Sequence, residues 1–482
     1  MLSSTLLVAG VDLRHGISHR RQSLPDPLPE LAAFLAPFSP LFRRTESRES
    51  LERYVTGLLT DLGRKNCDTI AAAVAGTSIE RLQHLLTDAD WDPGALDEAR
   101  VRSLAATSPR DGILALDDSG LPKQGKRSVG VQPQYCGALG KIANCQVVVS
   151  AEYVADEPSA TIPLHWPVSG RLFLPERWAD DLDRRTRAHV PKDVEFHTKL
   201  QLALDLIDRA TTWQVPFRFV VADAGYGDTP TFLDGLEARH LRYVCGVTRT
   251  FGVRLPDEVR DAATATPEKP KGKGRPKLPR AAPLHTVDAV IAAQPESAWQ
   301  TITWREGTKG PLGKQFLAIR VHRATGNPDT GPHGRSVHHA TMSTGSEGWL
   351  LAERPVPGED GERKWYYANL PADTSLHRLV TLAHSRWLIE QFYEDGKGEC
   401  GLDDYQGRRW DGFHRHLALV MLTYSFLMMQ RHTVSEPPDG GLSPLSRRDL
   451  SRHAPAGSHL VVSGSRPLAH RDRSDHGLPA AT

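Results

Sequence analysis

ILALDDSG at residues 113–120 and FRFVVADAGYGD at residues 217–228 are the two stretches that decide the fold. Each is a short apolar run that leads into acids and turn residues, a pattern typical of a buried strand. Asp117 and Asp118 end the first run, and Asp223 ends the second. A carboxylate at the end of a buried strand is costly unless a positive group balances it. The pattern therefore favours a shared cation such as Mg²⁺, which prefers oxygen ligands. At either site alone, an acid that merely begins a turn explains the sequence equally well.

The segments around these two runs predict a mixed α/β domain. Strands are expected at NCQVVVSAEYVA, residues 144–155, more weakly at TIPLHWPV, residues 161–168, and again from residue 241 at LRYVCGV. Residues 195–213 have helical spacing of apolar side chains. Strands followed by a helix and a further strand are typical of α/β folds. Between residues 298 and 370, strand-like segments separated by turn residues predict a β-rich insertion.

Helical periodicity flanks this region on both sides. It extends from about residue 28 to residue 104, and it returns at residues 375–398 and 414–432. We therefore divide the chain into an irregular extension (1–27), an all-helical N-terminal domain (28–108), the first part of the α/β domain (109–247), the β-rich insertion (248–372), the C-terminal helices of the α/β domain (373–432), and a polar tail that we expect to be disordered (433–482).

The composition is that of an ordinary globular protein. The chain has 482 residues, of which 39% are hydrophobic and 24% charged, and its net charge is +1. It has no stretch near the ~20 apolar residues of a membrane span, and no basic region precedes the apolar start, so we expect a cytoplasmic protein with no membrane partner. Five cysteines without CxxC spacing argue against a disulfide framework and against a structural zinc site.

A third acid stands on the helix predicted at residues 375–398. At about 100° per residue, Arg386, Glu390 and Lys397 fall within one narrow stripe of that helix. Such a stripe can present an acid and two cations to a common site. A solvated ladder of ion pairs is the alternative, because Arg386 and Glu390 are four residues apart.

Taken together, these motifs resemble the DDE transposases of bacterial insertion sequences, in the IS-four superfamily and most closely its seven-oh-one group. The segment LALDDSGLPKQGKRSVGVQPQYCGALGKIANCQV is similar to the region around that family's first catalytic acid, and VVADAGYGD to the second. Arg386-x3-Glu390-x6-Lys397 matches three letters of the signature Y-x2-R-x3-E-x6-K, with Ala383 in the place of the tyrosine. The N-terminal LFRRTESRESLERYVTGLLTDLGRKN is also similar, and the resemblance covers about residues 30–432.

The resemblance implies an α/β, ribonuclease-H-like catalytic domain with a β-rich insertion, preceded by helices that bind DNA ends. It assigns Asp118, Asp223 and Glu390 as catalytic acids that hold two Mg²⁺ or Mn²⁺ ions, which would clamp the attacking and leaving oxygens of a phosphoryl transfer. Asp117 is the alternative first acid, and Asp118 is preferred because family members commonly have Thr or Ser after that acid. Arg386 and Lys397 would contact DNA phosphates.

The implied activity is cleavage of DNA at insertion-sequence ends, followed by strand transfer into target DNA. The implied partners are double-stranded DNA, as terminal inverted repeats and as target, and a second copy of the chain in a homodimer. The expected place of action is the bacterial cytoplasm, on the nucleoid when DNA is bound. Two other functions stay open: a DNA-binding repressor without catalysis, and a metal-dependent nuclease without strand transfer.

Several other residues have two interpretations each. Lys123, Lys126 and Arg127 would line the DNA path or form a solvated loop. A basic run would be a phosphate-binding arm or a soluble linker; its members are Lys269, Lys271, Lys273, Arg275, Lys277 and Arg280. Trp387 would stack on a base or pack in the core, and the run Arg408, Arg409, Trp410 would hold DNA or form a surface patch. His165, His189 and His384 lack metal-like spacing and are expected to be structural.

Overall fold

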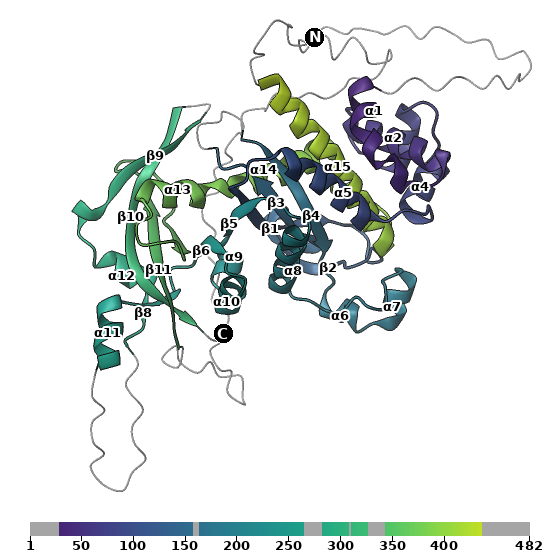
Figure 1. Ribbon diagram of the computed structural model, residues 1–482. Coiled ribbons are helices and arrows are strands. Elements are labelled where there is room, and N and C mark those ends of the chain that lie inside the picture. Colours follow the sequence, from purple (N-terminus) through teal and green to yellow (C-terminus); the bar gives the residue numbers. More distant parts are fainter. Residues whose placement is uncertain (1–27, 158–162, 265–281, 308–309, 326–342, 436–482) are drawn as a thin grey trace, which may run out of the picture.

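The computed structural model describes residues 28–157, 163–264, 282–307, 310–325 and 343–435. The extension 1–27, the basic run at 269–280 and the tail after residue 435 lie outside these residues. The described part forms one 12-stranded sheet in the order β2-β3-β1-β5-β6-β12-β11-β10-β7-β8, with β4 also paired to β3 and β9 to β10. Figure 1 shows the central strands in blue, the insertion in green to one side, and the N-terminal helices in purple on the other.

The centre of the sheet contains the strands that the sequence predicts. β1 (Gly112–Pro122) pairs antiparallel with β3 (Lys141–Val154), which pairs antiparallel with β4 (His165–Leu172). β5 (Phe217–Ala222) pairs parallel with β1 and with β6 (Arg242–Val247). This mixed sheet fits the ribonuclease-H-like nuclease domain that the resemblance implies. A further strand, β2 (Gln132–Cys136), pairs with the start of β3 and is followed by a short 3-10 turn, η2 (Gly137–Leu139).

The two faces of β1 are buried against different helices. Ile113 and Ala115 belong to a core that includes Leu388 and Phe392 of the C-terminal helices. Leu114 and Leu116 belong to a second core that contains the inward side chains of α8 (Lys199–Thr212) and α10 (Pro230–Ala238). Successive side chains of a strand point to opposite faces, so consecutive residues of β1 face different layers.

Helix α8 begins four residues later than the predicted start at residue 195. Thr198 and Gln201 form a capping box at Lys199, in which each side chain accepts a hydrogen bond from the other residue's backbone N–H. The short helices α6 (Glu176–Ala179) and α7 (Leu182–Arg187) precede α8, and α9 (Ala224–Gly227) follows β5.

The insertion extends the central sheet instead of forming a separate one. β12 (Lys364–Ala368) pairs antiparallel with β6, and β11 (Ser343–Arg354) and β10 (Gly310–Thr325) continue outward. The other elements of the insertion are β7 (Gly252–Arg254), α11 (Pro256–Thr264), β8 (His285–Thr286), α12 (Val287–Ala292), η3 (Glu296–Ala298) and β9 (Gln300–Gly307).

The N-terminal helices do not form a core of their own, so the expected separate helical domain is not confirmed. They are α1 (Pro29–Leu35), η1 (Ala36–Leu41), α2 (Thr45–Leu59), α3 (Cys67–Ala73), α4 (Ile79–Thr87) and α5 (Pro93–Thr107). Val55 and Leu58 share one buried cluster with Leu417 of α15 (Trp410–Ser435). In Figure 1, α15 passes between these helices and the central sheet.

The single helix predicted at residues 375–398 is wrong. The chain forms α13 (Leu376–Ser385) and α14 (Trp387–Cys400), which meet at Arg386. At the junction the Ser385 hydroxyl donates to the Leu382 carbonyl, and the Ile389 N–H bonds three residues back to Arg386. Both contacts replace regular helical bonds. Among the helices of the described ranges, none has the length and apolar character needed to cross a membrane.

Candidate active site

Asp117, within β1, and Asp223, directly after β5, lie at neighbouring positions on the same face of the sheet. In the parallel pairing of β1 with β5, Leu116 is opposite Ala222, so the next residues of both strands are these two acids. Val221 packs in the same core as Ala115, whereas Ala222 packs in the other core, so the alternation carries Asp223 to the face of Asp117. Asp223 also caps α9, where its Oδ1 accepts from Gly225 N at 2.9 Å.

The stripe predicted on the C-terminal helix faces this edge of the sheet. The Arg386 guanidinium donates to Asp117 Oδ2 at 2.8 Å and also pairs with Glu390. Lys397 Nζ donates to Ser119 Oγ at 2.8 Å. Arg386 is the junction residue, and Glu390 and Lys397 follow on α14. The three residues thus contact β1 or one another, although the helix that was expected to align them is broken.

A tyrosine that sequence reasoning missed fixes α14 to β1. Tyr393 OH donates to the Asp117 carbonyl at 2.9 Å and lies 2.6 Å from Ser150 Oγ on β3. Tyr393 follows Glu390 by three residues, so the helical spacing that groups Arg386 with Glu390 also brings this hydroxyl to the strand. That spacing was the signal available in the sequence.

Asp118 points into the opposite layer. Its Oδ1 accepts from Lys199 Nζ of α8 at 2.9 Å, and its Oδ2 accepts from Tyr226 OH of α9 at 3.3 Å. Neither partner was singled out from the sequence, although Tyr226 lies in the segment VVADAGYGD around the second acid.

The electrostatics distinguish Asp117 further. Burial raises the pKa of the Asp117 carboxyl to about 7; the Arg386 charge opposes this rise, and the neighbouring Asp223 and Asp118 charges add to it. A buried acid that titrates near neutral pH beside other charged groups is a candidate functional group.

Comparison with known proteins agrees with this site. The family described as DDE superfamily endonuclease matches residues 37–311, which is more than half of the chain. The chain belongs to the DDE superfamily endonucleases. The matched region includes Asp117, Asp118 and Asp223, and it ends before Glu390.

A curated relative points to the same group. The chain is similar to a protein of Microchaete diplosiphon named probable transposase for insertion sequence element IS701, with 28% identity over 220 residues. The similar region is 45% of this chain and 53% of the relative, so the chain spans about half the length of the relative. The resemblance to DDE transposases of the seven-oh-one group, predicted from the three motifs, is thereby confirmed.

DDE superfamily enzymes generally use divalent metals. The acids of this endonuclease provide some, but not all, of the ligands that such an ion needs. Asp117 and Asp223 are two oxygen donors on adjacent strands, and Mg²⁺ is commonly held by one or two carboxylates together with water and phosphate. Across the ranges that the structure describes, no three His, Cys, Asp or Glu side chains come close enough to hold a metal. Glu390 is held by Arg386, and its side chain is 56% exposed.

The remaining predicted cations differ in their surroundings. Lys123 Nζ donates to the carbonyls of Asp403 and Tyr405 at 2.9 and 2.7 Å, and burial lowers the pKa of this amine to about 8. Lys126 and Arg127 are exposed in the loop after β1. Arg409 pairs with Asp88 and Asp411, and Arg408 beside it is exposed.

The aromatic and histidine candidates pack inside the protein or at its surface. Trp410 and Ala383 are buried, and Trp387 lies under the Arg305 guanidinium, 4.1 Å from ring centroid to Cζ. His165 is buried against Glu152, and His384 stacks on Trp304. His189 is exposed and lies at a turn, where its backbone φ is 54°.

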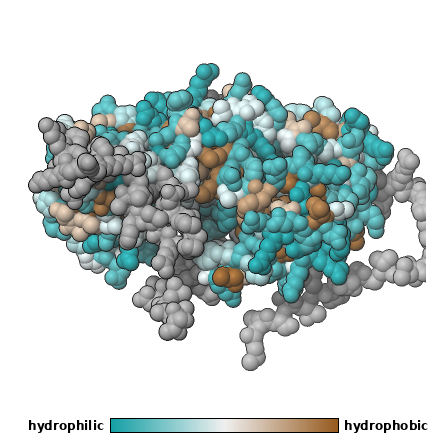
Figure 2. Space-filling view, turned by 90° about the horizontal axis from the view of Figure 1, so that it is seen from below, coloured by the Kyte–Doolittle hydropathy of each residue, from teal (hydrophilic) through white to brown (hydrophobic). Residues whose placement is uncertain are grey.

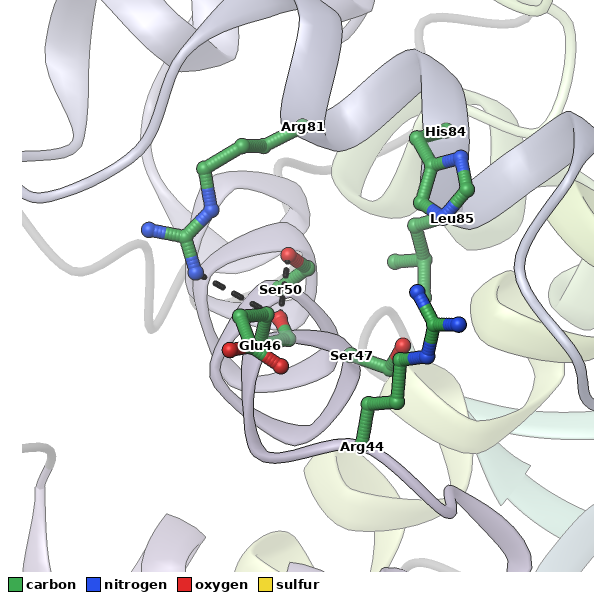
Figure 3. A pocket seen from close by; sticks show the side chains of 7 residues that line it. All are labelled: Arg44, Glu46, Ser47, Ser50, Arg81, His84 and Leu85. Carbon is green, nitrogen blue, oxygen red and sulfur yellow. Dashed lines mark hydrogen bonds between the residues drawn. The ribbon is translucent and has the colours of Figure 1, made fainter.

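A surface pocket lies away from these acids, among the N-terminal helices. Figure 3 shows that its lining comes from the start of α2 and from α4: Arg44, Glu46, Ser47, Ser50, Arg81, His84 and Leu85. Within it, Ser50 Oγ and Arg81 both donate to the Glu46 carbonyl, at 2.7 and 3.4 Å. The pocket contains none of the residues of the candidate active site.

Proposed function

We propose that this endonuclease is a transposase that cuts DNA at the ends of an insertion sequence and joins the cut ends to target DNA. One observation carries the proposal: Asp117 of β1 and Asp223 after β5 directly follow the paired residues Leu116 and Ala222, and Arg386 contacts both Asp117 and Glu390. Three acids far apart in the sequence are thereby directed to one edge of the sheet. The family membership and the transposase relative support the same activity.

Within this proposal, Asp117 replaces Asp118 as the first catalytic acid. The serine that follows Asp118 favours Asp118 by resemblance, but its carboxylate is directed toward Lys199 and Tyr226 in the other layer. Asp117 shares its face with Asp223 and contacts the arginine that holds Glu390. Asp118 then acts by anchoring α8 and α9 to the strand.

Asp117 and Asp223 would hold divalent cations, Mg²⁺ or Mn²⁺, and two ions are proposed, with Glu390 as a further ligand once it leaves Arg386. Such ions supply positive charge for the attacking and leaving oxygens of an in-line phosphoryl displacement. The chain's own cations complete the site. Arg386 neutralises two of the acids and has the fork geometry for a bidentate phosphate contact, and Lys397 supplies a point charge beside Ser119.

The finer features of the activity follow from the same proposal. The substrate is double-stranded DNA, as the terminal inverted repeats of an element and as its target. Two copies of the chain hold the two ends, since both must be cut and joined together. The N-terminal helices bind the ends, and Lys126 and Arg127 contact phosphates near the cut. The protein acts in the bacterial cytoplasm, on the nucleoid when DNA is bound.

A nicking assay tests the function. A supercoiled plasmid that contains an element end is incubated with the protein, with Mg²⁺, with Mn²⁺ or with EDTA, and nicked and joined products are separated on a gel. We expect nicking only with a divalent metal, and joined products with target DNA. Glu390→Gln should reduce nicking at least about a hundredfold and leave DNA binding intact.

Glu394→Gln is the matched control, because Glu394 is an exposed acid of the same helix. It should nick as the wild type does. Binding without nicking by the wild type would contradict the proposal and favour a repressor. Nicking without joined products would restrict the function to that of a nuclease.

A further inference from the structure

The hairpin formed by β2 and the start of β3 has an unusually apolar tip. Tyr135, Leu139 and Ile142 are 65%, 43% and 73% exposed. Tyr135 is directly opposite Ile142 in the antiparallel pairing, so the two side chains lie side by side on one face. The molecular face shown in Figure 2 is mostly hydrophilic, with hydrophobic side chains in small separate patches. An exposed apolar cluster on such a surface is a candidate contact site.

The base of this hairpin is firmly attached to the strand that holds Asp117. Cys136, Cys145 and Val147 form a small buried cluster at the base. Gly120 allows this close approach, because a Cβ there would lie 2.7 Å from Cys136 Sγ. Since Cys145 is opposite Pro122, the last residue of β1, the tip extends beyond the end of that strand. Ile142 is eight residues along β3 from Ser150, the partner of Asp117, which places the tip about 26 Å from that acid, within one turn of a DNA duplex.

The charge around the tip favours nucleic acid as the partner. From Ser119 to Ala151 the sequence contains four basic residues and no acid. Lys126, Arg127 and Lys141 are exposed, and none of them forms an ion pair with another residue of the described ranges. Phosphates attract such cations, and exposed aromatic and aliphatic side chains pack on bases and sugars. A second copy of the chain would bring like charges together.

We propose that the tip of the β2–β3 hairpin packs on the DNA that extends away from the bond that is cut. Tyr135, Leu139 and Ile142 contact sugar and base surfaces, and Lys126, Arg127 and Lys141 contact the flanking phosphates. This inference rests on the proposed function. It adds Tyr135, Leu139, Lys141 and Ile142 to the phosphate contacts proposed for Lys126 and Arg127, within the segment that follows the first acids.

The test measures affinity for a fluorescent duplex that contains an element end, by anisotropy over a series of salt concentrations. The double variant Tyr135→Ser, Ile142→Thr removes the apolar pair with residues that suit an exposed strand. We expect binding to weaken about tenfold or more with an unchanged salt dependence. Arg127→Gln and Lys141→Gln should each lower the salt slope by about one.

Leu312→Ala is the matched control, because Leu312 is 44% exposed and also lies on a strand that forms a hairpin. It should bind DNA as the wild type does. Tyr135→Phe, which keeps the ring, should retain most of the affinity, and circular dichroism checks that each variant folds.

The outcomes separate this inference from the function on which it rests. A wild type that binds no duplex overturns the proposed function, and the inference with it. A wild type that binds and nicks, together with a double variant of unchanged affinity, overturns the inference alone. If that variant instead loses self-association in sedimentation, the tip contacts a second copy and the DNA assignment is wrong.

Discussion

Asp117 and Asp118 are adjacent in the chain and lie in different chemical surroundings. The period of two in a strand directs Asp117 to Arg386 and Asp118 to Lys199. Composition and motif cannot separate these two acids, because both are Asp at the end of the same apolar run. The pairing of β1 with β5 separates them, since it aligns Asp117 with Asp223. The roles of the two carboxylates therefore depend on register.

This difference predicts unequal effects of two matched substitutions. Asp117→Asn should reduce metal-dependent nicking at least about a hundredfold, because it removes a carboxylate from the proposed metal site. Asp118→Asn should keep nicking within about tenfold of the wild type, because the amide oxygen can still accept from Lys199 and Tyr226. Initial nicking rates at saturating Mg²⁺ provide the comparison. The reverse order of effects would restore Asp118 as the first acid.

At the scale of elements, the insertion packs against the α13–α14 junction on both sides of Arg386. His384 stacks on Trp304 of β9, with ring centroids 3.9 Å apart and planes inclined at 19°. Trp387 lies under Arg305 of the same strand. Because residues 384 and 387 flank Arg386, these contacts fix the direction of its side chain. The insertion thus positions a residue of the site without supplying one of its acids.

Weakening these packing contacts should affect catalysis more than DNA binding. Trp304→Ala is expected to destabilise the protein by about 2 kcal/mol, since it removes a partly buried aromatic ring. It should also lower the kcat for nicking with little change in KM for DNA, and Trp304→Phe should restore most of the kcat. A fall in stability without a change in kcat would show that Trp304 is structural only.

A buried acid of the insertion also contacts α13, and we expect this contact to be sensitive to low pH. Glu353 of β11 has a fully buried side chain beside Lys314 and His384. Burial favours the neutral form, but the contacts with His384 and Lys314 outweigh it and hold the pKa of Glu353 at about 2. A lowered pKa stabilises the folded state above the ordinary value of 4.5, and this contribution disappears as the pH falls toward 2.

Glu353→Gln should therefore flatten the loss of stability in acid. Urea midpoints at pH 5, 4 and 3 should fall more steeply for the wild type than for this variant, by an amount on the order of 2 kcal/mol over the full range. Glu347→Gln, a more exposed acid of the same strand, is the control and should follow the wild type. Parallel curves for wild type and Glu353→Gln would contradict the assignment.

At the scale of the whole molecule, the N-terminal helices and the catalytic sheet share their interior. Tyr54 OH of α2 hydrogen-bonds His416 Nδ1 of α15 at 2.9 Å. Arg100 of α5 is fully buried and donates to the carbonyls of Pro167 and Val168 in β4 and to Ser425 Oγ in α15. These contacts join the chain's beginning to its centre and its C-terminal helix. The helices therefore stabilise the enzyme, whatever else they bind.

This shared interior predicts that the sheet cannot fold alone. A fragment of residues 109–435 should be insoluble or lack a cooperative transition, because it would expose the apolar face of α15. In the full chain, Arg100→Leu should destabilise by about 3 kcal/mol, since it leaves Asp97 and several buried carbonyls without their donor. The loss of stability caused by Arg100→Leu should be the same whether unfolding is followed by near- or by far-ultraviolet circular dichroism. A soluble fragment with a sharp transition would establish an independent domain.

The sequence by itself determined the central strands, the order of the acids along the chain and the family. Apolar runs bounded by turn residues specify strands locally, and the spacing of Arg386, Glu390 and Lys397 is a property of the chain alone. Only the tertiary structure decided which neighbouring acid joins Asp223, where the C-terminal helix breaks, and that the N-terminal helices share a core. The β2–β3 hairpin also went unnoticed in the sequence, because Gln132–Cys136 has no apolar run. Each of these depends on which surfaces far apart in the chain pack together, and local patterns do not encode that pairing.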